Sequence, residues 1–173
     1  QTGLRALPRE AVEKLVDAKH IYLLGVRSSA FLAGYLNFYF HLIFKNVTLV
    51  QSAAGEIFDQ MLRIGPGDVL VGISFPRYSQ IAVNAVRFAR DRGADVIAVT
   101  DIKMSPIYKM ASASLLVSSD MISFVDSMAA PVSLLNALIM AVGQQKSEET
   151  AESFSELERV WSQYGVFGDA EDE

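Results

Sequence analysis

Short apolar runs alternate with longer segments of helical periodicity along most of the chain. Runs rich in Val, Ile and Leu predict five strands, at 21–24, 47–50, 69–73, 95–100 and 115–117. The run at 69–73 is apolar almost throughout, which is typical of a strand covered on both faces. The alternation of strand and helix predicts an α/β fold, in which helices cover both sides of a parallel sheet.

Between the strands, apolar residues recur at helical spacing. They predict a helix that begins near Pro8, and further helices at 31–44, 54–63, 79–92, 130–142 and 149–164. Segment 31–44 is apolar nearly all round, so we expect one face on the sheet and the other on a partner helix or a second subunit. Gly93 is expected to end the helix before it. The stripe of Phe154, Leu157 and Trp161 in the last helix predicts core packing or a dimer seam.

The organisation of the 173 residues favours a single main domain. We expect residues 1–20 to hold the end of a linker and the first helix, 11–145 the α/β domain, and 146–165 the C-terminal helix. The acidic tail at 166–173 is expected to be disordered. Because the chain begins with Gln1, we expect it to be a trimmed piece of a longer protein.

Composition narrows the function classes. The net charge of −5 disfavours nucleic-acid binding by this chain alone, because phosphate contacts need a basic surface. The absence of cysteine excludes disulfides, thiolate metal sites and cysteine nucleophiles. His20 and His41 have no clustered carboxylates, so no metal or other cofactor is expected. No apolar stretch reaches the ~20 residues that a membrane span needs, and we expect a cytoplasmic protein.

Two polar loops follow predicted strands and carry the candidate chemistry. Arg27, Ser28 and Ser29 come after the first strand, and the second loop holds Ser74, Arg77 and Ser79. Hydroxyls and backbone N–H groups at a helix N-terminus bind phosphate and other anions, and arginine pairs with phosphate in a bidentate way. The carboxyl ends of parallel strands meet at one edge, so both loops are expected to face one anionic ligand. The alternative is that these serines only cap helices.

Other polar residues are weaker candidates. Glu56 follows the second strand, where a carboxylate can accept sugar hydroxyls, act as a base or stabilise a helix N-terminus. Asp126 is a lesser candidate of the same kind. Thr100 and Asp101, with Ser105 further on, end the fourth strand and are better explained as a capped turn.

The loops resemble those of the sugar isomerase (SIS) domain, and more narrowly the effector half of RpiR-type transcriptional regulators. The resemblance runs from about residue 11 to 142 and is carried by segments 24–29, 72–79 and 99–101, together with Ser105 and Pro106. It implies a three-layer sandwich with a five-stranded parallel sheet in flavodoxin-like strand order. It also implies a homo-oligomer, dimeric or tetrameric, that binds a phosphosugar at the strand ends.

The resemblance assigns residues one by one, and it has departures. Ser29 matches the last serine of the family's Gly-x-Gly-x-Ser loop, whereas Arg27 replaces its second glycine. Ser74 and Ser79 match the outer hydroxyls of the Ser-x-Ser-Gly-x-Thr loop, whereas Pro76 and Arg77 replace its middle Ser-Gly. Glu56 falls where many relatives carry a glutamate. These changes leave open whether the phosphate is held by arginine, or whether the ligand differs from a typical phosphosugar.

Three functions follow from these expectations. The favoured one is the phosphosugar-sensing, dimerising domain of a regulator that contacts DNA only through a helix-turn-helix domain absent from this chain. The second is an aldose–ketose phosphosugar isomerase with Glu56 as the base, although the chain shows no clear second acid/base group. The third is a dimerisation domain that has lost its ligand. The favoured function is not enzymatic, and no residue is assigned a catalytic role.

Overall fold

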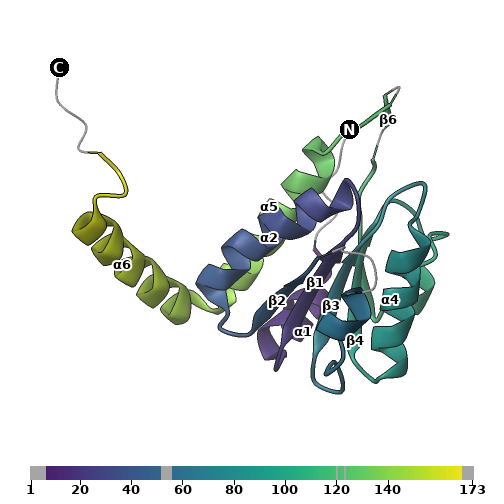
Figure 1. Cartoon of the computed structure of the whole chain (residues 1–173), viewed down its shortest axis with the longest axis horizontal. Helices are drawn as coiled ribbons and strands as arrows, with labels where there is room; N and C mark the ends of the chain where they lie inside the picture. Colours follow the sequence, from purple (N-terminus) through teal and green to yellow (C-terminus); the bar gives the residue numbers. More distant parts are fainter. Residues whose placement is uncertain (1–6, 52–55, 120, 123, 169–173) are drawn as a thin grey trace.

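Five parallel strands form the central sheet of the computed structural model, which describes residues 7–51, 56–119, 121–122 and 124–168 (Figure 1). The strands are β1 (Ile21–Gly25), β2 (Val47–Val50), β3 (Val69–Ile73), β4 (Asp95–Thr100) and β5 (Ala113–Leu116). They lie in the order β2-β1-β3-β4-β5, and every neighbouring pair is parallel. The predicted sheet and its flavodoxin-like order are therefore confirmed.

Helices cover both faces of the sheet. One face carries α1 (Arg9–Asp17), α2 (Ser29–Ile43) and α5 (Ala129–Gln145), and the other carries α3 (Ile57–Gln60), α4 (Gln80–Asp91) and the short 3₁₀ helix η1 (Tyr108–Met110). Successive side chains of a strand point to opposite faces, so β3 sends Val71 into one hydrophobic cluster and Leu70 into the other. Two separate cores on one sheet give the predicted three-layer sandwich.

Most element boundaries follow the sequence pattern closely. Gly93 ends α4 with φ of +85°, a left-handed conformation that glycine adopts without strain. The strand expected at 115–117 begins two residues earlier, at Ala113. The helix expected over 54–63 is described only as the short α3, and residues 52–55 lie outside the described part of the chain.

A two-stranded hairpin was not predicted from the sequence. Strands β6 (Met121–Ile122) and β7 (Val125–Asp126) pair in antiparallel fashion between β5 and α5. In Figure 1 the hairpin projects at the end of the molecule where α2 begins. Its strands are too short to give a periodic hydrophobic signal.

The last helix, α6 (Ser147–Tyr164), extends away from the sandwich (Figure 1). It has no buried residue, so the stripe of Phe154, Leu157 and Trp161 is not core within one chain. The dimer seam stays a prediction. Beyond the helix, the Phe167 ring stacks edge-on against Trp161 at 5.1 Å. The acidic residues 169–173 lie outside the described part of the chain.

None of the helices in the described ranges combines the length and the apolar character needed to cross a membrane. The longest of them, α6, carries glutamates in its first turn.

Candidate functional site

Sheet register places the two polar loops side by side. Gly25, the last residue of β1, pairs with Ile73, the last residue of β3. The chain therefore leaves the sheet at the same level in both strands, and each loop leads into a helix, α2 or α4. A Cβ on Gly25 would lie only 2.1 Å from the Ser29 carbonyl oxygen, so the first turn requires glycine.

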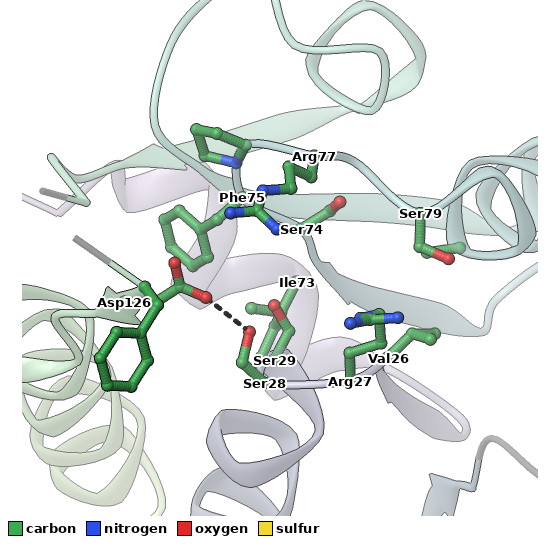
Figure 2. A pocket seen from close by; sticks show the side chains of 13 residues that line it. Val26, Arg27, Ser28, Ser29, Ile73, Ser74, Phe75, Arg77, Ser79 and Asp126 are labelled. Carbon is green, nitrogen blue, oxygen red and sulfur yellow. Dashed lines mark hydrogen bonds between the residues drawn. The ribbon is translucent and has the colours of Figure 1, made fainter. Parts of the chain in front are cut away.

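Between the loops lies a pocket of about 570 Å³ (Figure 2). Six of the seven predicted ligand residues line it, and Glu56 does not. The lining residues are Val26, Arg27, Ser28, Ser29, Ile73, Ser74, Phe75, Pro76, Arg77, Ser79, Ala82, Phe124 and Asp126. The expectation that both loops face one cavity agrees with this geometry.

The serines are not used as helix caps. Ser28 and Ser79 occupy the N-cap positions of α2 and α4, but neither side chain makes a capping hydrogen bond. The alternative interpretation, capping without a ligand, therefore lacks its defining contact. Ser29 and Ser74 are 6% and 4% exposed, so they lie at the floor of the pocket.

Both arginines of the site have unusual backbone conformations. Arg27 has φ of 57° and Arg77 has φ of 64°, and no other non-glycine residue in the described part of the chain has a positive φ. Left-handed backbone costs an L-residue about 1–2 kcal/mol. The two positions are those where the resemblance expects glycine. Arginine therefore keeps the backbone shape of the turn and adds a cation to it.

Figure 2 shows the two guanidinium groups on different walls of the pocket, Arg77 on the 74–79 loop and Arg27 at the start of α2. Strained backbone clusters at ligand sites, where the surrounding structure holds it in place. The strained backbone of Arg27 and Arg77 therefore agrees with a ligand site at these two loops.

The hairpin supplies a carboxylate to the same pocket. Ser28 Oγ donates a hydrogen bond of 3.0 Å to Asp126 Oδ2, and Phe124 beside it is 87% exposed and lines the pocket. Sequence reasoning gave Asp126 little weight and did not consider Phe124. The sequence offers little indication of either residue, because the two-residue strands of the hairpin show no periodic pattern of apolar and polar positions.

A tyrosine ties the second loop to the neighbouring strand. Tyr78 Oη donates to Asp101 Oδ1 at 2.6 Å, and Thr100 Oγ1 donates to the same oxygen at 3.2 Å. Burial of the phenol, together with the hydrogen bond and the negative charge of Asp101, raises the pKa of Tyr78 to about 12. The phenol therefore stays a donor, and it anchors the residue next to Arg77.

The remaining candidates lie elsewhere. Glu56 is exposed at the start of α3, where its carbonyl oxygen accepts from Gln60, and its role as a ligand residue stays a prediction. Thr100 and Ser105 are fully buried and do not line the pocket. Ser105 Oγ accepts from the Tyr108 backbone N–H at 3.3 Å, which agrees with the capped turn that was expected there.

The arrangement suits an anion with hydroxyl groups attached. Serine hydroxyls, two guanidinium groups and the starts of two long helices surround one space, and Asp126 adds an acceptor. No cluster of histidines and carboxylates that could hold a metal ion occurs among the described residues.

Comparisons with known proteins agree with this geometry. A family model described as the SIS domain matches residues 14–141. The chain is 27% identical over 160 residues to an uncharacterized HTH-type transcriptional regulator from Caldanaerobacter subterraneus subsp. tengcongensis. That match covers 88% of this chain and 55% of the relative, so the chain spans about half the length of that protein.

Solved structures share the fold at lower identity. The sugar isomerase domain of an RpiR transcription factor from Sphaerobacter thermophilus superimposes with a TM-score of 0.82 at 23% identity, covering 87% of this chain and 84% of that one. The NanR protein of Vibrio vulnificus, complexed with ManNAc-6P, gives 0.76 at 18% identity, covering 92% of this chain and 61% of that one.

Proposed function

Because the chain belongs to the SIS domain family, we propose that it is the phosphosugar-sensing effector domain of an RpiR-type transcriptional regulator. The ligand is a phosphorylated sugar held between the loops after β1 and β3. DNA binding would reside in a separate helix-turn-helix domain.

One observation carries the proposal. The two loops that follow neighbouring strands line a single pocket with four serine hydroxyls and two arginine side chains, and the serines at the helix starts do not cap their helices. A phosphate group offers acceptor oxygens that match these donors. The pocket volume of about 570 Å³ falls within the range of small-molecule sites.

The relatives support the regulatory side of the proposal. One curated relative is named as an HTH-type transcriptional regulator, one structural neighbour is the sugar isomerase domain of an RpiR transcription factor, and another, NanR, is complexed with ManNAc-6P. A ligand regulates only if it binds two arrangements of the protein with unequal affinity. We infer that the ligand changes how paired subunits sit, and thereby how attached DNA-binding domains are spaced.

The test is calorimetric titration with a panel of hexose and pentose phosphates. Ser74→Ala removes a hydroxyl from the pocket floor and should weaken binding about tenfold, the value of one hydrogen bond to a charged group. Arg77→Ala should weaken it by at least as much. Ser133→Ala is the matched control, because Ser133 is exposed on α5 and bonds only the Ala129 carbonyl.

Equal affinity of the wild type, Ser74→Ala and Arg77→Ala for the same ligand would contradict the site. Failure of every phosphosugar to bind would favour the remaining possibility, a SIS dimerisation domain without a ligand.

Self-association is part of the proposal. Large apolar side chains are exposed on α2, α5 and α6, including Phe31 at 80%, Phe38 at 65% and Met140 at 66%. Surfaces of this kind mark protein interfaces. We infer that they pack against a second copy of the chain.

The isomerase alternative has one observation in its favour. Asp126 places a carboxylate in the pocket, where it could act as a base on a bound sugar. The test is incubation with an aldose phosphate in deuterated water. Isomerisation would exchange the proton on the carbon next to the carbonyl for deuterium. Turnover abolished by Asp126→Asn or Glu56→Gln would replace the regulatory function with an enzymatic one.

A further inference from the structure

Asp126 makes one end of the pocket chemically different from the other. The described lining contains two cations, Arg27 and Arg77, and one carboxylate, which comes from the β6–β7 hairpin. Ser28 donates to that carboxylate at 3.0 Å instead of capping α2. An acceptor-only group thus stands at the start of α2, in a pocket otherwise rich in donors.

This placement separates the two ends of a bound ligand. A phosphate dianion is repelled by a nearby carboxylate and attracted by helix N-termini and hydroxyls. The start of α4, at Ser79, offers those attractions on the side of the pocket opposite Asp126, and the Ser74 hydroxyl lies between the two (Figure 2). The phosphate therefore belongs toward α4, and the rest of the ligand extends toward Asp126.

We propose that Asp126 is a specificity-determining residue that selects ligands whose non-phosphate end carries hydroxyl or ammonium donors. A carboxylate can accept about four hydrogen bonds, so Ser28 leaves it capacity for a ligand. A second anionic group at that end, as in a phosphorylated sugar acid, is rejected by like charge. The ligand class is thus a neutral or amino sugar phosphate. This inference rests on the proposed function.

Four probes separate the two ends of the ligand. Glucose 6-phosphate, glucosamine 6-phosphate and 6-phosphogluconate share a phosphate and differ at the opposite end, which is neutral, cationic or anionic. Inorganic phosphate has no such end. Calorimetry on the whole chain should show 6-phosphogluconate binding at least tenfold more weakly than glucose 6-phosphate, with glucosamine 6-phosphate the tightest.

Asp126→Asn should change these ratios. Glucosamine 6-phosphate should no longer bind more tightly than glucose 6-phosphate. The affinity for 6-phosphogluconate, relative to glucose 6-phosphate, should rise about tenfold, because asparagine keeps the size of the aspartate side chain without its negative charge. Inorganic phosphate binds with the same or greater affinity. Asp17→Asn removes one charge from the exposed C-terminal end of α1 and should leave all four affinities unchanged.

Ser28→Ala provides a second variant, in which Asp126 loses its partner and keeps its charge. The order of affinities for the three sugar phosphates should stay the same in this variant. If the Ser28–Asp126 hydrogen bond had only a structural role, its loss would not be expected to preserve that order.

Two results would overturn the inference. One is a wild-type preference for 6-phosphogluconate over glucose 6-phosphate. The other is an Asp126→Asn variant that changes the affinity for all probes by one common factor, or for none. If inorganic phosphate binds and the sugar probes do not depend on Asp126, the inference fails alone. If no probe binds, inorganic phosphate included, the proposed function fails with it.

Discussion

At the scale of single residues, the pocket combines local strain with useful chemistry. Arg27 and Arg77 both hold left-handed backbone, and both line the cavity. Glycine would adopt that backbone without cost, whereas arginine brings a guanidinium that can pair with a phosphate. These positions illustrate how a ligand site accepts a loss of stability in exchange for a charged group.

Arg27→Gly should therefore separate stability from binding. Relief of the strained backbone offsets the greater freedom of glycine in the unfolded chain, so the free energy of unfolding should stay equal or rise by up to about 1 kcal/mol. Phosphosugar affinity should fall about tenfold or more. Urea unfolding and calorimetry measure the two effects.

Arg87→Gly is the control for that experiment. Arg87 is exposed in the middle of α4, where glycine replaces a good helix former, so its free energy of unfolding should fall by about 1 kcal/mol without an effect on binding. A similar loss of stability in Arg27→Gly would show that the left-handed turn carries no strain.

The residue scale also shows the limits of the sequence. Ser28, Ser29, Ser74 and Ser79 could be assigned to one site, because all four lie in the short loops that follow two apolar strands. Asp126 could not, because only the folded hairpin brings it to Ser28, 98 positions away in the chain. Local patterns predict what a strand end presents, and they do not predict which distant segment folds over it.

At the scale of elements, the loop after β3 depends on a neighbouring strand. The Tyr78–Asp101 hydrogen bond fixes this loop to the end of β4, next to the strained Arg77. The five strands were predictable, because buried parallel strands give continuous apolar runs. The hairpin was not, because its strands are only two residues long. The outward course of α6 was not, because its apolar stripe is not buried within one chain.

The Tyr78 phenol should lose its proton only at high pH. Its pKa is raised to about 12 from an ordinary value near 10, so the hydrogen bond contributes its full stability below about pH 10 and loses it as the pH rises through about 12. The phenolate absorbance of the wild type, minus that of Tyr78→Phe, should show this one titration.

Tyr78→Phe should also lower the free energy of unfolding by about 1.5 kcal/mol at neutral pH, because Asp101 loses a donor. A difference titration centred near pH 10, with unchanged stability, would mean that the tyrosine does not hold the loop.

At the scale of the whole molecule, the sandwich and α6 are separable. Both hydrophobic cores draw their buried residues from the sheet, α1 to α5 and the segments between them, and α6 contributes none. The Phe38 side chain on α2 and the Met140 side chain on α5 remain exposed. We expect the sandwich to fold by itself, and the self-association proposed above would bury the exposed apolar side chains.

A chain that ends at Lys146 should thus keep a cooperative unfolding transition and the secondary structure of the sandwich. Its self-association should weaken, which light scattering after size-exclusion chromatography measures. An unfolded truncated chain would contradict the separation of the core from α6, and an unchanged assembly would place the interface elsewhere.

The central claim is that the two strand-end loops bind one phosphorylated sugar between them. Amide chemical shifts of isotope-labelled protein, recorded during titration with sugar phosphates, test it most directly. The account predicts that the backbone amides of residues 26–29, 74–75 and 77–79 shift together, along one saturation curve, whereas the unphosphorylated sugar shifts neither loop. Changes confined to one loop, or found only at other surfaces, would contradict it.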